Sequence, residues 1–115
     1  QQTRCFCDVQ ETIRALRDLM TDLNRTAGQI FNVGANNQSS IIGLAERIKA
    51  MVHSGSPLVH IPFDEVYGTG IEDMLHRVPC IDKVRDTIGW VPKHTLEQIL
   101  TDVIASVADR EAIAA

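Results

Sequence analysis

The chain has 115 residues, of which 44% are apolar and 23% charged, and its net charge is −4. A chain of this length forms one domain. The acidic balance excludes a general nucleic-acid binder, which would carry a basic stripe. No apolar run approaches the ~20 residues that span a bilayer, and we expect no signal peptide before the domain. We therefore expect a cytoplasmic protein without membrane or nucleic-acid partners, in which any anion site is local.

The first part of the chain predicts a strand followed by an amphipathic helix. The strand candidate runs from Thr3 to Cys7. The sequence "DVQE" after it has the form of a capping box, in which Asp8 accepts the backbone N–H of Glu11. Apolar residues then recur at alternating steps of four and three, which predicts a single helical stripe. The stripe consists of Val9, Ile13, Leu16, Met20 and Leu23.

The middle of the chain predicts two more strands around a second helix. The apolar segment "QIFNVG", residues 29–34, is a compact strand candidate closed by a glycine. Ser40 is placed to cap a helix that continues to about Val52 and stops at "SGSP". The third strand candidate is "LVHIPF", residues 58–63, where Pro62 indicates an edge position or a strand end.

The last part of the chain predicts a loop and two helices. Gly68 and Gly70 permit a loop, followed by one helical turn. Asp82 is placed to cap a short helix that ends at Gly89 in a left-handed stop, and Trp90 is expected in the core. "TLEQ", residues 95–98, is a second capping box that starts the last helix. The whole pattern predicts an α/β fold with a small three-stranded sheet and about four helices.

The cysteines favour reduced thiols over a metal site. Cys5, Cys7 and Cys80 are odd in number and do not form a disulfide framework. A zinc site on Cys5 and Cys7 needs two further ligands, and the four histidines show no paired spacing. We expect no metal, and we rank a cysteine-dependent metal or redox protein last among three functional hypotheses.

Four blocks of the sequence, in order, resemble the NAD-dependent epimerase/dehydratase family, the extended short-chain dehydrogenases that modify nucleotide sugars. The blocks are "QTRCFCDVQETIRAL", "GQIFNVGANNQSSIIGLAERI", "IPFDEVYGTGIEDMLHR" and "RVPCIDKVRDTIGWVPKHTLEQIL". The third is similar to the branch around UDP-glucuronate decarboxylases and UDP-glucose epimerases. Together the blocks cover nearly the whole chain.

The resemblance implies that residues 1–115 are the C-terminal nucleotide-sugar-binding domain of a longer enzyme. Its NAD would bind to an N-terminal Rossmann lobe that this sequence lacks, and no cofactor is expected on this chain. The family's Tyr-x-x-x-Lys pair is missing, because the residue four positions after Tyr67 is Ile71. The glycine-rich dinucleotide loop is missing too. We therefore expect no catalytic residue here.

The resemblance also assigns substrate-binding roles. Arg4 and Arg77 match the family arginines that contact the substrate diphosphate, and a guanidinium fork suits phosphate oxygens. Cys80 stands where the family usually carries an aspartate associated with the ribose, and a thiol is a poor acceptor. Asn32 is a candidate for the lining of the same cleft, and Tyr67 for a lid over the sugar.

Each assignment has a structural alternative. Arg77 could be a surface arginine at the start of a helix, and Arg4 could form a salt bridge with Asp8 or Glu11. The loop around Tyr67 could be a surface connection. As a whole, the chain could instead be a stand-alone interaction or regulatory module that keeps the fold without the chemistry. The apolar stripe on the first helix should face the missing lobe, so we expect its exposure to cause homo-oligomerisation.

Overall fold

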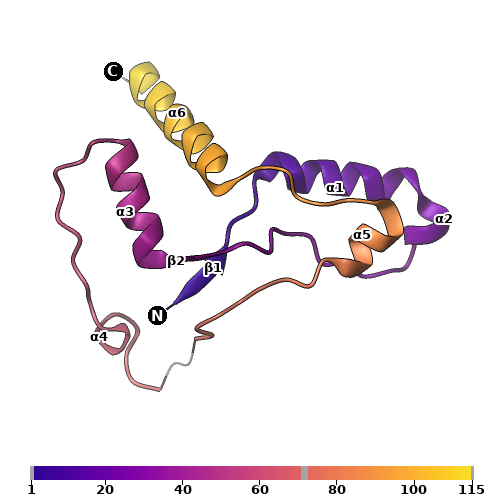
Figure 1. Cartoon of the computed structure of the whole chain (residues 1–115), viewed down its shortest axis with the longest axis horizontal. Coiled ribbons are helices and arrows are strands. Elements are labelled where there is room, and N and C mark those ends of the chain that lie inside the picture. The colour runs from indigo at the N-terminus through magenta and orange to yellow at the C-terminus, as the bar shows by residue number, and fades with distance from the viewer. Residues whose placement is uncertain (1, 71–72, 115) are drawn as a thin grey trace. The chain divides into compact units, whose positions relative to one another are not determined.

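The computed structural model describes residues 2–70 and 73–114 of the chain, and side chains up to residue 109 (Figure 1). The chain divides into two compact units. The first unit combines Gln1–Arg4 with Ser39–Arg77, and the second combines Cys5–Gln38 with Val78–Ala115.

The described residues form two short strands and six helices, which Figure 1 labels along the chain. The strands β1 and β2 pair in a two-stranded sheet. The elements are β1 (Thr3–Cys5), α1 (Val9–Thr21), α2 (Leu23–Thr26), β2 (Gln38–Ser40), α3 (Ile41–Met51), α4 (Phe63–Tyr67), α5 (Asp82–Ile88) and α6 (Leu96–Ala114). The α/β class is confirmed. None of the described helices is long and apolar enough to cross a membrane.

The prediction of a three-stranded sheet was wrong. Residues 29–34 and 58–61 are irregular, and β2 lies instead at Gln38–Ser40. A strand needs a neighbour that accepts its backbone hydrogen bonds, and β-propensity reports only how well side chains fit a pleated surface. Phe31 and Val33 reach the core of the second unit without such a ladder. The helical turn expected after Gly70 falls partly on residues 71–72, outside the described residues, while α4 lies before the two glycines.

Two of the four predicted N-terminal helix caps are confirmed in full. The Ser40 hydroxyl accepts the Gly43 N–H at 3.1 Å at the start of α3. The Thr95 hydroxyl accepts the Gln98 N–H at 3.3 Å, while the Gln98 side chain accepts the Thr95 N–H at 2.8 Å. That reciprocal pair is the predicted capping box, and it sets the first residue of α6.

The other two predicted caps differ in their partners. Asp8 caps α1 by accepting the N–H of Gln10 at 2.6 Å rather than that of Glu11. Asp82 is the first residue of α5, whose N-cap position is Ile81 with no side-chain cap, and its carboxylate pairs with Arg85 at 2.8 Å instead. A carboxylate in the first helical turn still stabilises the helix dipole.

Trp90 lies at the centre of the second unit's core. It is 1% exposed and clusters with Ala15, Ile81 and Val84. The chain reaches this position through Gly89, which ends α5 with φ 70° and ψ 11° and donates its N–H to the Arg85 carbonyl at 2.7 Å. The left-handed stop and the buried tryptophan are therefore both confirmed.

The predicted apolar stripe of α1 faces away from this core. The helix buries Glu11 and Ala15 on its inner side. Val9, Ile13, Leu16 and Met20 lie on the opposite side because each residue advances by about 100° around a helix, whereas Leu23 lies beyond the end of α1, in α2. Their exposed fractions are 65% for Val9, 51% for Ile13, 53% for Leu16, 73% for Met20 and 63% for Leu23. The chain therefore carries an uncovered apolar surface, named here the α1 stripe.

Candidate functional site

Arg4 is held by the segment that follows residue 72. Its Nη1 donates to the carbonyl oxygens of Thr3, Met74 and Leu75 at 2.8, 2.9 and 3.4 Å. Its Nη2 forms an ion pair with the Asp73 carboxylate at 2.7 Å. The structural alternative was an ion pair of Arg4 with Asp8 or Glu11, but the structure shows that Arg4 pairs with Asp73 instead. The arginine is therefore fixed in position by its own unit.

Arg77 lies on the same segment as the residues that hold Arg4. That segment is bound to β1 because the Thr3 N–H donates to the Leu75 carbonyl at 2.8 Å and the Thr3 hydroxyl lies 2.7 Å from Nδ1 of His76. Arg77 follows directly, is exposed, and makes no hydrogen bond or ion pair with the part of the chain that the structure describes. Its donors are thus available to a ligand.

Asn32 and Cys80, two further candidates, lie together in the second unit. The Asn32 side-chain amide donates to the Cys80 carbonyl at 3.3 Å. Gly34 permits this approach, since a Cβ at that position would lie 3.1 Å from Pro79. The Cys80 thiol is exposed and lies 3.4 Å from the Asp82 carboxylate. The Asp82 carboxylate therefore lies beside the Cys80 thiol.

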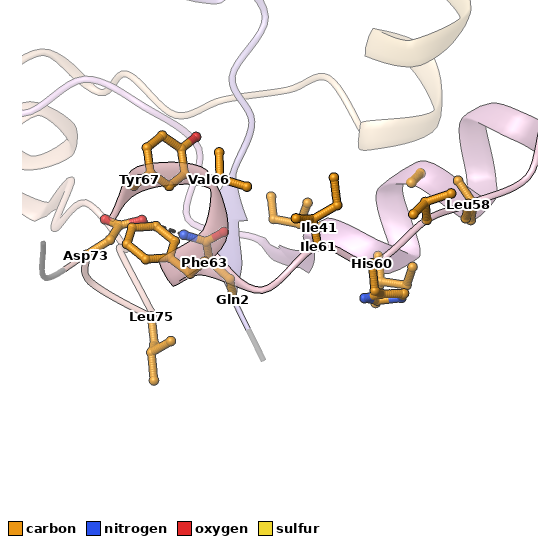
Figure 2. A pocket seen from close by; sticks show the side chains of 13 residues that line it. Gln2, Ile41, Leu58, His60, Ile61, Phe63, Val66, Tyr67, Asp73 and Leu75 are labelled. Atoms are coloured by element: carbon orange, nitrogen blue, oxygen red, sulfur yellow. Dashed lines mark hydrogen bonds between the residues drawn. The ribbon is translucent and has the colours of Figure 1, made fainter. Parts of the chain in front are cut away.

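Tyr67 lines an apolar pocket of about 760 Å³ in the first unit (Figure 2). Its ring and that of Phe63, both from α4, have centroids 4.6 Å apart. Polar groups come from Gln2, His60 and Asp73, and the rest of the wall is apolar: Ile41, Ile42, Ala45, Leu58, Val59, Ile61, Val66 and Leu75. Figure 2 shows Asp73 and Gln2 joined by a hydrogen bond at the end of the pocket near α4. Neither Arg4 nor Arg77 is among the lining residues.

The sequence did not reveal the role of Glu11. This carboxylate is 2% exposed and accepts hydrogen bonds from the Arg14 guanidinium, the Lys93 N–H at 3.0 Å and His94 Nδ1 at 2.7 Å. Burial, the largest influence, raises its pKa, but the hydrogen bonds from Arg14, His94 and Lys93 together lower the pKa from 4.5 to about 2. Glu11 therefore ties the segment after Trp90 to α1.

The thiols of Cys5 and Cys7 show no sign of activation. Burial raises the pKa of Cys5, and it also raises the pKa of Cys7 despite a hydrogen bond to Thr12. A raised pKa lowers the fraction of reactive thiolate. Among the described residues, no group of three or more His, Cys, Asp or Glu side chains is arranged to hold a metal ion.

Known proteins give this geometry a context. No family model matches the chain. The chain is 34% identical over 104 residues to UDP-N-acetyl-alpha-D-glucosaminuronate decarboxylase of Bacillus cytotoxicus, a match that covers 90% of this chain and 32% of the relative. The chain is homologous to a nucleotide-sugar decarboxylase. Because the match covers 32% of the relative, this chain spans about a third of the length of that protein.

A solved structure supports the same relationship. The chain resembles the PbgP3 protein from Burkholderia pseudomallei with a TM-score of 0.63 and 26% sequence identity. The similarity covers 87% of this chain and 29% of the other. Both comparisons thus match most of this chain to less than a third of a longer protein.

Proposed function

We propose that the chain is the substrate-binding portion of an NAD-dependent nucleotide-sugar epimerase, dehydratase or decarboxylase. In this proposal Arg77 and Arg4 hold the diphosphate of a UDP- or dTDP-sugar. The observation that carries it is the homology to a UDP-sugar decarboxylase over 90% of the chain. The exposed Arg77, next to a segment that is bonded to β1, supports the proposed role of its guanidinium.

The proposal assigns the chemistry to the part of the longer protein that this sequence does not contain. NAD would bind there, and the catalytic tyrosine and lysine would lie there. The residues of this chain would bind and orient: the arginines at the diphosphate, Asn32 and Cys80 near the ribose, and Tyr67 near the sugar. The missing lobe would also cover the α1 stripe.

Binding by this chain alone should be weak. Two charged hydrogen-bonding interactions contribute about 1.5–3 kcal/mol each, and immobilising the ligand opposes that sum. An affinity near 1 mM corresponds to about −4 kcal/mol. We therefore expect millimolar or weaker binding of UDP, and micromolar binding would contradict the division of the site between two lobes.

Replacing Arg77 with glutamine should weaken the binding of UDP by roughly tenfold, because one charge-assisted interaction with phosphate is lost. Protein-observed NMR titration measures the affinity in this range. Arg17→Gln is the matched control, since Arg17 is an exposed arginine of the second unit that pairs only weakly with Asp18. Equal weakening by both substitutions would show that the effect is one of overall charge and would refute the assignment of Arg77.

The α1 stripe favours a second candidate function, that of an interaction module, and makes its own prediction. We expect the chain to self-associate at high concentration through this surface, and Leu16→Lys to weaken the association by roughly tenfold or more, given about 1.5–3 kcal/mol for a buried leucine. Analytical ultracentrifugation measures the change. Val107→Lys is the control, because Val107 is 50% exposed on α6. A wild-type chain that stays monomeric throughout would contradict the prediction.

A further inference from the structure

The Asp73 carboxylate occupies the side of Arg4 that a phosphate would need. Its Oδ2 lies 2.7 Å from Nη2 of Arg4 and accepts a hydrogen bond of 2.5 Å from the Gln2 side chain. The Gln2 bond is drawn in Figure 2. Asp73 is therefore held in place from two directions.

The donors of Arg4 are unequally committed. Nη1 carries two N–H groups and faces three carbonyl oxygens, from Thr3, Met74 and Leu75. These bonds fix the guanidinium whether or not Asp73 is present. Phosphate is recognised in a bidentate manner by two adjacent donors of the fork. With Nη1 engaged, that pair is Nε and Nη2, and Nη2 is the atom that Asp73 contacts.

We propose that Asp73 is an internal competitor for the anion site of Arg4, which a phosphate group must displace before Arg4 can bind it. The inference rests on the proposed function, because it presupposes that Arg4 receives a diphosphate. A carboxylate and a phosphate are both oxygen anions that satisfy the same donors. Asp73 thus keeps the charge of Arg4 compensated in the absence of ligand and sets a threshold that favours a doubly charged group over a single carboxylate.

The competition also connects two parts of the first unit. Asp73 and Gln2 both line the apolar pocket, whereas Arg4 does not. Release of Asp73 from Arg4 leaves its carboxylate beside Gln2 at the pocket wall. Anion binding at Arg4 should therefore alter the NMR signals of the pocket residues Phe63 and Tyr67.

The test is a double-mutant cycle in which inorganic pyrophosphate is the probe. Protein-observed NMR on the whole chain measures its affinity for each variant. Asp73→Asn should bind pyrophosphate about fivefold more tightly than the wild type, the scale of one partly exposed ion pair. The gain should disappear in the Arg4→Gln background. Glu65→Gln is the matched control, because it removes an exposed carboxylate of α4 in the same unit that is not among the bonding partners of Arg4. Asp73→Ala serves as a second variant and should give a gain of the same direction.

The outcomes separate this inference from the proposed function. If Asp73→Asn binds no more tightly while binding still depends on Arg77, the competition is refuted and the diphosphate site stands. If Asp73→Asn gains affinity equally with and without Arg4, or no more than Glu65→Gln does, the gain is a general charge effect and the competition is again refuted. If none of the proteins binds pyrophosphate up to tens of millimolar, both proposals fail.

Discussion

Replacing Trp90 with alanine is expected to lower the free energy of unfolding by about 3–5 kcal/mol, the range for truncating a buried aromatic side chain. The indole is 1% exposed, packs on Ala15, Ile81 and Val84, and donates its Nε1–H to the Glu11 carbonyl at 3.2 Å. The Arg14 guanidinium also lies over its ring, 5.4 Å from the centroid. The total free energy of unfolding of a domain is about 5–15 kcal/mol, so the expected loss is a large share of it. Urea denaturation measures it.

Two companion variants make that result specific. Trp90→Phe keeps an aromatic ring but removes the Nε1–H donor, so it should cost less than Trp90→Ala. Val103→Ala removes a valine that is 53% exposed on α6 and should change stability by less than about 0.5 kcal/mol. Comparable losses for Trp90→Ala and Val103→Ala would contradict the packing described for the core.

Replacing Glu11 with glutamine should lower the free energy of unfolding by about 3 kcal/mol at neutral pH, because the buried network around it loses its negative charge. The pKa of Glu11 falls from 4.5 to about 2 on folding. A lowered pKa contributes stability above about pH 4.5, and that contribution is lost as the pH falls toward about 2. At 1.36 kcal/mol per pKa unit, it is on the order of 3 kcal/mol.

The pH dependence is the sharper part of this prediction. The difference in unfolding free energy between the wild type and Glu11→Gln should be constant above about pH 5 and should shrink between about pH 4.5 and 2. Chemical denaturation at a series of pH values measures it. Asp86→Asn is the control, because Asp86 is an exposed carboxylate that also pairs with an arginine, Arg85. A difference that does not change with pH would show that Glu11 acts through its shape and not its charge.

The local signals in the sequence predicted most of the helices. Capping residues and apolar spacing depend on contacts within a few positions, which the sequence displays directly. The reciprocal bonds of Thr95 and Gln98, the cap at Ser40 and the left-handed Gly89 were all predicted on this basis. The same holds for the buried Trp90, which follows a helix stop.

The sequence could not predict contacts between distant segments. A strand forms only where a neighbour pairs with it, so the apolar runs at 29–34 and 58–63 gave false strands. Glu11 had the spacing of a capping box, yet its carboxylate bonds with Lys93 and His94, more than 80 positions away. Asp73 reaches Arg4 across 69 positions. The only hint of the Arg4–Asp73 ion pair in the sequence was the presence of an acidic residue shortly before Arg77.

The most direct test of the account follows the arginine side chains themselves. The Nε signals of the arginines can be resolved by NMR while pyrophosphate is added to the chain. We expect the signals of Arg77 and Arg4 to shift with one common binding curve, while those of Arg17 and Arg25, which pair with Asp18 and Asp22, stay in place. An unmoved Arg77, or equal movement of all four arginines, would contradict a diphosphate site on this chain.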